Sequence, residues 1–256
     1  MKKWKWHLFL ILSIALTVLF GYGAVSAYVD VTSPPKTKTL TKSEVSPVTP
    51  GDTYIAVGDS LSRGVGSSKG RGFVSLVGND LKDNKTIDRF QNLGVSGARI
   101  EDLLEQLEQK EIKKTLKNAK IISISIGGNN LFNSGEVLKE FSEEKTLSVL
   151  KSEIPNLEKV FKSIRKNNPD AIVLYVGLYN PFRQSDDEDS FDSIVQNWNE
   201  DARKLGLKYK IKVVDTFNLV NNPKRDLSSD VFHPNDATYK QIADSMSLII
   251  EKSIVR

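Results

Sequence analysis

Short apolar runs alternate with longer amphipathic segments along most of this 256-residue chain. The apolar runs are rich in Ile and Val, a composition typical of strands that are buried on both faces. We expect strands at residues 53–57, 89–93, 121–126, 171–176 and 212–214. The amphipathic segments carry apolar residues at helical spacing. They predict helices at residues 73–82, 100–115, 147–166, 190–205 and 235–252.

The regular order of strand and helix predicts the fold class. Strands that are joined by helical crossovers form a parallel sheet with helices on both faces, so we expect an α/β domain. Residues 51–256 show no internal repeat and no second domain boundary. Pro155 lies within the predicted helix 147–166, where it marks either a kink or the start of the main part of that helix.

The N-terminal residues 1–27 have the pattern of an export segment. Lys2, Lys3 and Lys5 precede an apolar run that extends to Ala27. Small residues near Ala27 fit a signal peptide that is cleaved there. The run is also about as long as one membrane span, about 20 residues, so it fits an uncleaved anchor equally well. Both alternatives place the rest of the chain outside the cytoplasm, because basic residues keep the N-terminal side inside.

A spacer separates this segment from the domain. Residues 28–50 are rich in Thr, Ser, Pro and Lys and predict a disordered or extended linker. Residues 1–50 contain six lysines and two acidic residues, so 51–256 contain 30 basic and 30 acidic residues. The net charge of +4 therefore belongs to the leader and spacer. The neutral domain gives no reason to expect nucleic-acid binding.

Several kinds of chemistry are excluded by composition and spacing. The chain has no cysteine, which excludes disulfides, thiolate metal sites and a cysteine nucleophile. The glycine-rich stretch 64–72 has Lys69 where a dinucleotide fingerprint needs Gly or Ala, and it lacks the Gly-Lys-Ser/Thr triplet of a Walker loop. We interpret it as a flexible loop. The acidic run 186–189 lacks EF-hand spacing and predicts a solvated loop near the rim of the site.

Polar residues follow the first three predicted strands, at the sheet edge where α/β proteins bind ligands. Gly58-Asp59-Ser60 follows the first strand, and Ser60 is either an exposed nucleophile or a cap for the next helix. Gly94 follows the second strand. Its loop either lets the backbone approach a ligand closely or is simply a tight turn between strand and helix. Asn129 follows the third strand, where its amide either donates into a crevice or caps the next segment.

His233 is the only histidine available to the domain, because the other one, His7, lies in the export segment. Asp230 precedes it by three residues, a spacing that brings two side chains together in a turn or helical step. A carboxylate beside an imidazole fixes its tautomer and stabilises the imidazolium. The pair therefore predicts a base for Ser60, although a surface position is the default for any single histidine.

These blocks, in this order, resemble the SGNH (GDSL) hydrolase family, most closely its bacterial lysophospholipase/arylesterase/thioesterase-like branch. The resemblance implies that Ser60 is the nucleophile, with Asp230 and His233 as the triad acid and base. It also implies an oxyanion hole formed by the backbone N–H groups of Ser60 and Gly94 and by the Asn129 side chain. It implies no metal and no cofactor.

The resemblance also implies a flavodoxin-like three-layer sandwich with strand order 2-1-3-4-5. The chain departs from the family at Asn130, where Asp is common. We expect an exported serine esterase or acylhydrolase that acts as a monomer near the membrane on small-molecule or lipid esters. The alternatives are a carbohydrate O-acetyl esterase that acts on cell-wall glycans and a catalytically idle surface-binding module.

Overall fold

The structure is a computed structural model that describes residues 52–254. The predicted export segment, 1–27, and the predicted spacer, 28–50, lie outside the described residues. Within 52–254, no helix is both long enough and apolar enough to cross a membrane.

The centre of the domain is a five-stranded parallel sheet with the order β2-β1-β3-β4-β5. This order confirms the predicted α/β class and the order that the family resemblance implies. The strands are β1 (Thr53–Gly58), β2 (Arg89–Asn92), β3 (Ile121–Ser125), β4 (Ile172–Val176) and β5 (Ile211–Val214). All five run in the same direction, so their carboxyl ends meet at one edge.

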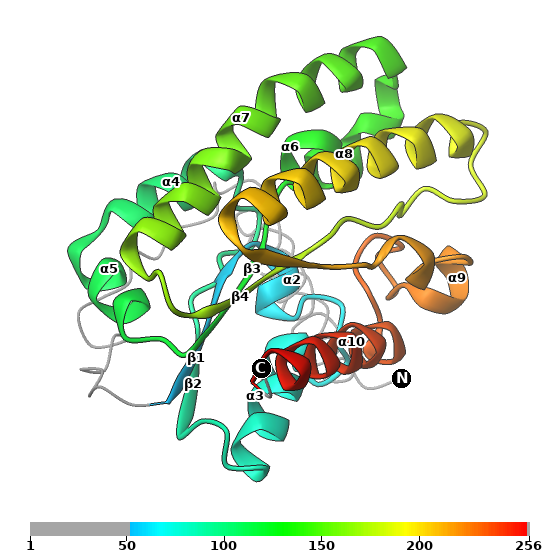
Figure 1. Cartoon of the computed structure of the whole chain (residues 1–256). Coiled ribbons are helices and arrows are strands. Elements are labelled where there is room, and N and C mark those ends of the chain that lie inside the picture. Colours follow the sequence, from blue (N-terminus) through cyan, green and yellow to red (C-terminus); the bar gives the residue numbers. More distant parts are fainter. Residues whose placement is uncertain (1–51, 255–256) are drawn as a thin grey trace, which may run out of the picture. The chain divides into compact units, whose positions relative to one another are not determined.

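Helices cover both faces of the sheet (Figure 1). One layer contains α3 (Phe73–Asp83) and α10 (Asp236–Ile254), and the other contains α4 (Ile100–Glu108), α5 (Lys110–Lys117), α7 (Glu143–Asn167) and α8 (Glu188–Tyr209). The shorter elements lie in the connections at the carboxyl edge of the sheet. They are α2 (Ser60–Arg63), α6 (Gly128–Phe132), α9 (Pro223–Asp226) and the 3-10 segments η1 (Asn133–Glu140) and η2 (Phe217–Leu219).

Alternation along the strands divides the core between the two layers. Tyr54 and Ala56 of β1 belong to the cluster that includes α3 and α10, whereas the side chains between them point to the opposite face. On that opposite face the Trp198 indole donates to the Tyr175 hydroxyl at 2.8 Å, and this hydroxyl donates to the Ile126 carbonyl, also at 2.8 Å. The bulkiest buried polar groups are thus satisfied.

The helix boundaries differ from the sequence predictions in three places. The predicted helix 100–115 is two helices that are separated at Gln109, whose ψ of 132° is extended. Helix α7 begins at Glu143, so Pro155 lies inside the helix and does not start it. The acidic run is only partly a loop, because Glu188 and Asp189 form the first turn of α8. Acidic side chains at that end of a helix are stabilised by its dipole.

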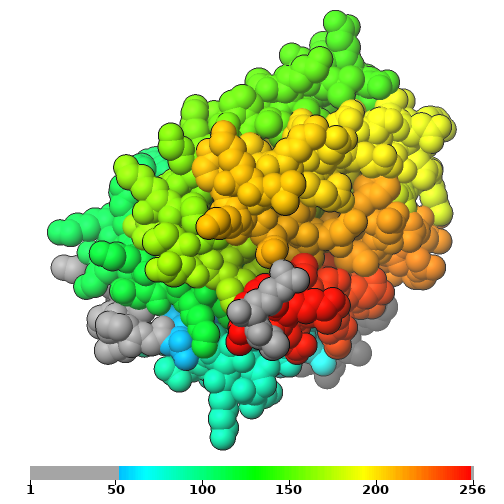
Figure 2. Space-filling model, viewed as in Figure 1, coloured from blue at the N-terminus to red at the C-terminus, as the bar shows by residue number. Residues whose placement is uncertain are grey.

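The segment between α8 and α10 is organised by one carboxylate, Asp226, at the end of α9. Figure 2 shows this segment in orange, at the surface between α8 in yellow and α10 in red. Asp226 accepts hydrogen bonds from the backbone N–H groups of Asn221 and Asn222 at 2.9 and 2.8 Å, and from the Arg225 guanidinium at 2.6 and 2.9 Å. Its own carbonyl accepts the Thr238 hydroxyl of α10.

Asp226→Asn should destabilise the domain, because the neutral amide loses the charge-assisted bonds, each worth about 1.5–3 kcal/mol. The hydrogen bond from Arg225 is the main reason that the pKa of Asp226 falls from 3.8 to about 2. A lowered pKa contributes stability above pH 4, and this contribution is lost as the pH falls through 2. Denaturant unfolding between pH 7 and pH 2 measures both effects. The variant should be less stable at pH 7 and should lose less stability on acidification; parallel curves would contradict this role.

Candidate active site

Ser60 stands where β1 turns abruptly into α2. Gly58 ends the strand at a φ of 129°, and a Cβ at this position would lie 1.9 Å from the Ser125 carbonyl oxygen of β3. Only glycine allows the two strands to approach this closely. The Asp59 side chain then caps α2 by accepting the Leu61 N–H at 3.1 Å. The helix cap is therefore Asp59, and Ser60 is the first residue of α2.

The structure brings Ser60, His233 and Asp230 into one hydrogen-bonded chain. Ser60 Oγ lies 2.8 Å from His233 Nε2, and His233 Nδ1 lies 2.7 Å from Asp230 Oδ2. Ser60 is 6% exposed, and the His233 side chain is 15% exposed. A serine, an imidazole and a carboxylate at these separations have the geometry of a nucleophile, its base and the group that orients the base.

Asp230 is held in place as a carboxylate. Its second oxygen, Oδ1, accepts the Ser228 hydroxyl at 2.7 Å and the backbone N–H groups of Phe232 and His233 at 3.0 and 2.9 Å. Burial raises the pKa of Asp230, but the hydrogen bonds from His233, Ser228 and Phe232 outweigh burial and bring the pKa to about 2. At neutral pH the group is charged, so the imidazole donates Nδ1–H to it and presents Nε2 to Ser60.

The loop that carries His233 is fastened at several points. The Tyr179 hydroxyl donates to the Phe232 carbonyl at 2.7 Å, and the Ser228 N–H donates to the His233 carbonyl at 2.8 Å. Val231 has a φ of 53°, which is a strained conformation for a β-branched residue. The surrounding bonds therefore hold the turn in a shape that the chain alone would not adopt.

The Asn129 side chain is oriented from two sides. Its Nδ2 donates to the Ala98 carbonyl at 2.9 Å, and its Oδ1 accepts the Ser134 hydroxyl at 3.1 Å. A primary amide carries two N–H hydrogens, so one remains for a ligand. The backbone N–H of Ser60 has no acceptor within residues 52–254, as expected for the first amide of a helix. Both donors belong to residues that line one pocket.

The amide of Gly94, the other donor that the family resemblance implies, is already engaged. It donates to Asn92 Oδ1 at 3.0 Å, so the predicted role of Gly94 would require this bond to break. In the same loop the amides of Ser96 and Gly97 have no acceptor in the described part of the chain. Gly97 also precedes Ala98, whose carbonyl binds Asn129.

Asn130, the departure from the family pattern, has a structural role. Its Oδ1 accepts the Ile100 N–H at the start of α4 at 3.0 Å, and its Nδ2 donates to Glu101 at 3.1 Å. An aspartate here would keep the first bond, but it would place a negative charge against Glu101. The amide therefore suits this chain and leaves Asn129 unaffected.

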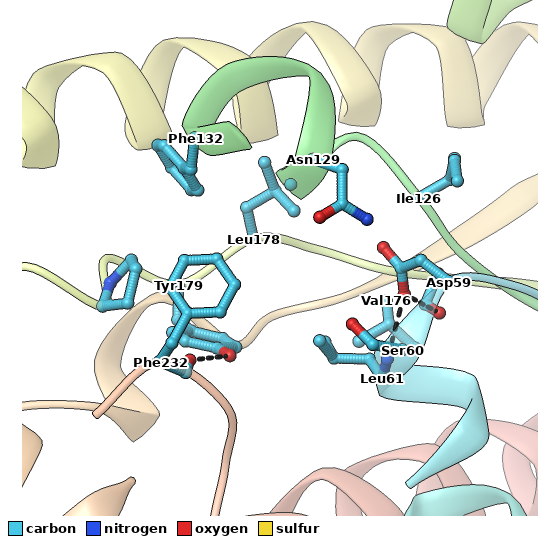
Figure 3. Close-up of a pocket in the computed structure, with 13 residues that line it drawn as sticks. Asp59, Ser60, Leu61, Ile126, Asn129, Phe132, Val176, Leu178, Tyr179 and Phe232 are labelled. Atoms are coloured by element: carbon cyan, nitrogen blue, oxygen red, sulfur yellow. Dashed lines mark hydrogen bonds between the residues drawn. The ribbon is translucent and has the colours of Figure 1, made fainter. Parts of the chain in front are cut away.

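Ser60 opens into a pocket with mostly apolar walls. Figure 3 shows Phe132, Leu178 and Tyr179 on the side of this pocket away from Ser60. Further apolar walls are supplied by Leu61, Ile126, Val176, Pro181 and Phe232. The Phe132 ring is supported from behind by the Phe182 ring in an edge-to-face contact, with centroids 5.3 Å apart.

A second hollow adjoins this pocket and shares Pro181 and Phe232 with it. Its walls come from η1, the loop that follows β4, and the His233 loop, and they carry charges of both signs. They include Glu136, Lys139, Arg183, Gln184, Asp230 and Val231. The apolar pocket and this mixed-charge groove therefore lie side by side, one lined by Ser60 and the other by Asp230.

The GDSL-like Lipase/Acylhydrolase family model matches residues 56–241. The chain belongs to this family. The curated protein YpmR of Bacillus subtilis is 34% identical over 209 residues, which are 77% of this chain and 80% of that protein. The spore germination lipase LipC of Bacillus licheniformis is 26% identical over 204 residues, which are 75% of this chain and 93% of LipC.

Solved structures agree with this assignment. A lipase from a goat rumen metagenome matches with a TM-score of 0.70 and 26% identity, over 77% of this chain and 97% of that one. The acetylxylan esterase Axe2 of Geobacillus stearothermophilus matches with a TM-score of 0.61 and 18% identity, over 80% and 96%. The second likeness shows the fold alone. Together the family and the lipase relatives identify the chain as an ester hydrolase.

Gly66→Ala should lower turnover without touching any reacting atom. Gly66 has a φ of 94°, and an added Cβ would lie 2.8 Å from the His233 Cβ and 2.5 Å from the Pro234 carbonyl oxygen. The His233 loop must shift to make room, and a displacement of about 1 Å can cost about 100-fold in rate. Gly70→Ala is the matched control, because it lies in the same loop at a φ of 61° with nothing within 4 Å. Equal turnover of a short acyl ester by the two variants would contradict the prediction.

Proposed function

We propose that this protein is an extracytoplasmic serine esterase that cleaves carboxylic esters through an acyl-enzyme on Ser60. The observation that carries the proposal is the unbroken chain from Ser60 Oγ through His233 to Asp230, with contacts of 2.8 and 2.7 Å. A serine hydroxyl is a weak nucleophile, and an adjacent base is what makes it reactive.

Acylation begins when Ser60 Oγ attacks the ester carbonyl carbon and its proton passes to His233 Nε2. Asp230 stabilises the imidazolium that results. The Ser60 N–H and the second N–H hydrogen of Asn129 donate hydrogen bonds to the former carbonyl oxygen, which now carries a negative charge. We propose the Gly94 amide as a third donor, which would exchange its present bond to Asn92 for a bond to this oxygen. Each such donor is worth about 10²–10³ in turnover.

The tetrahedral intermediate collapses when the bond to the leaving oxygen breaks and His233 gives that oxygen the proton. The alcohol leaves, and the acyl group stays on Ser60 as an ester. Water then repeats the sequence: His233 takes its proton, the hydroxide oxygen attacks, and the proton returns to Ser60 Oγ as the carboxylic acid departs. The reaction uses only these side chains and backbone groups.

The two neighbouring hollows support a substrate with an apolar acyl part and a polar leaving group. The pocket walls around Phe132, Leu178 and Tyr179 suit the acyl part, and the groove with Lys139 and Arg183 suits a polar or charged alcohol. A lysophospholipid or another acyl ester has this division. An O-acetyl ester of a cell-wall glycan is the second candidate, since an acetyl group also fits beside Ser60.

The cellular setting belongs to the same proposal. The basic, apolar pattern of residues 1–27 supports a position outside the cytoplasm, near the membrane, and we propose that the domain acts there as a monomer. Cell fractionation of the full chain and light scattering of the domain test these two points. Recovery with the cytoplasmic fraction would contradict the first, and a stable dimer would contradict the second.

Ser60→Ala should abolish esterase activity and leave the fold intact, because the alanine methyl group fills the same place without a nucleophile. A fluorophosphonate probe should label the wild type and leave the variant unlabelled. A panel of phenyl esters of increasing chain length, together with acetylated glycans, then separates the two substrate classes. An unlabelled but folded wild type would support the idle binding module.

His233→Ala should be more damaging than Asp230→Ala, because it removes the proton acceptor, whereas Asp230 orients that acceptor. In a serine protease of the same logic the losses were about 10⁶-fold for the base and about 10⁴-fold for the acid. Adding Ser60→Ala to either variant should cost little more than Ser60→Ala alone. Acylation rates for the single and double variants provide the measurement, and near-normal acylation by His233→Ala would refute the assignment of the base.

A further inference from the structure

The two oxygens of the Asp59 carboxyl group differ in the donors that reach them from other residues. Oδ1 accepts the Leu61 N–H at 3.1 Å and the Ser125 hydroxyl at 2.8 Å. No donor from another described residue reaches Oδ2. Asp59 is only 4% exposed, and it lines the apolar pocket together with Ser60 and Asn129. Figure 3 shows its carboxyl group between these two residues.

Within residues 52–254, no lysine or arginine lines the pocket into which this carboxyl group opens. Tyr179 is the other titratable residue among those that line it. Tyr175 on β4 and Tyr239 on α10 also lie near enough to interact with the charge of Asp59. His233 is reached through Ser60, and its own negative partner is Asp230. Burial raises the pKa of Asp59 to about 6, against the opposing hydrogen bonds from Ser125, from Leu61 and from its own backbone N–H.

The hydrogen bonds behind Asp59 have one proton too few while the group is charged. Three contacts run in line: Asp59 Oδ1 to Ser125 Oγ at 2.8 Å, Ser125 Oγ to Ser62 Oγ at 2.8 Å, and Ser62 Oγ to the Val57 carbonyl at 3.1 Å. Two serine hydroxyls supply only two protons for these three contacts. Ser125 Oγ also accepts the Ser62 N–H at 3.2 Å. With a proton on Asp59 Oδ1, Ser125 would donate to Ser62 and no longer to Asp59, and each of the three oxygen-to-oxygen contacts would contain one proton.

An acyl group that enters the pocket favours the neutral form of Asp59 further. It displaces water from Oδ2 and supplies no donor, so a charged carboxylate would be left buried and unpaired, which is costly. In the neutral acid the proton lies on the Ser125 side, and the oxygen that faces the pocket is an uncharged carbonyl. A neutral Asp59 also removes a negative charge from beside the oxyanion that forms on the substrate.

We propose that Asp59 determines which acyl groups the pocket accepts: it takes up one proton from solvent when an uncharged acyl group binds, and its charge repels acyl groups that carry a carboxylate. The proton returns to solvent when the acid product leaves. This inference rests on the proposed esterase function and names the acyl class, uncharged and apolar, for the same site.

The linkage has a definite sign. Because the bound state holds more protons than the free state, affinity for a neutral acyl ester should be highest below the pKa of free Asp59, near 6. It should fall as the pH rises, by up to about tenfold per pH unit, until the pKa of the complex is reached.

Binding without turnover tests the proposal. Calorimetry of phenyl butyrate with Ser60→Ala, from pH 5.5 to pH 8, should show about tenfold weakening or more across this range. The affinity of the double variant Ser60→Ala/Asp59→Asn for phenyl butyrate should depend little on pH, because Asn resembles the neutral acid. His233 is present in both proteins, so its contribution cancels. Asp52→Asn in the same background is the matched control at the other end of β1 and should leave the dependence unchanged. If the affinity for phenyl butyrate depends equally on pH with and without Asp59→Asn, the proposal is overturned.

A second probe tests the acyl class in the active enzyme. Phenyl hydrogen succinate carries a carboxylate on its acyl group, and Asp59→Asn should narrow the preference of the enzyme for phenyl butyrate over this ester by about tenfold or more. If Asp59→Asn does not fold, infrared titration of the Asp59 carboxyl group in Ser60→Ala, with and without phenyl butyrate, replaces both measurements. The pKa should rise on binding, and an unchanged pKa overturns the proposal. If a fluorophosphonate probe labels the wild type and the wild type hydrolyses phenyl butyrate, the esterase function holds. An unchanged pKa then refutes the proposed role of Asp59 alone.

Discussion

The site depends on the close approach of two neighbouring strands, β1 and β3, at their carboxyl ends. Gly58 lies directly against the Ser125 carbonyl, and the Asp59 N–H donates to that carbonyl at 2.9 Å. The Ser125 hydroxyl returns a bond to the Asp59 carboxyl group. These contacts hold the turn that carries Ser60 against the strand that leads to Asn129, so the proposed nucleophile and a proposed oxyanion donor are positioned by the same two strands.

The proposed base, His233, lies on a separate and more strained part of the chain. The His233 loop connects α9 to α10, far along the sequence, and closes over Ser60 only because other elements hold it. Tyr179, in the loop that follows β4, holds it from one side through a hydrogen bond, and Gly66 packs closely against it. Strain at Val231 is tolerated because the Asp230 carboxylate binds the backbone on its C-terminal side. The same carboxylate also orients the imidazole. One group therefore both holds the loop in shape and directs the His233 ring.

Much of this could be predicted, because strands and motifs leave local signals. Apolar runs located all five strands, and the order of the glycine, asparagine and histidine blocks indicated the family. The break at Gln109 left no such signal, because Ile112 and Leu116 beyond it are buried like the apolar residues before it. A periodic apolar face survives a change of helix direction, and the pattern therefore cannot show one.

The sequence by itself determined the α/β class, the strand positions and the residue types that the chemistry needs, since these depend on periodicity and short-range spacing. Tertiary structure decided which groups are free to act. The amide of Gly94 is bonded to Asn92, and the cap of α2 is Asp59 with Ser60 next to it. That Leu61 and Ser125 both donate to the same oxygen of Asp59 is likewise a fact of the folded chain. Hydrogen-bond partners from distant segments are chosen only when the strands meet, so whether a donor is free or occupied is a property of the assembled sheet edge.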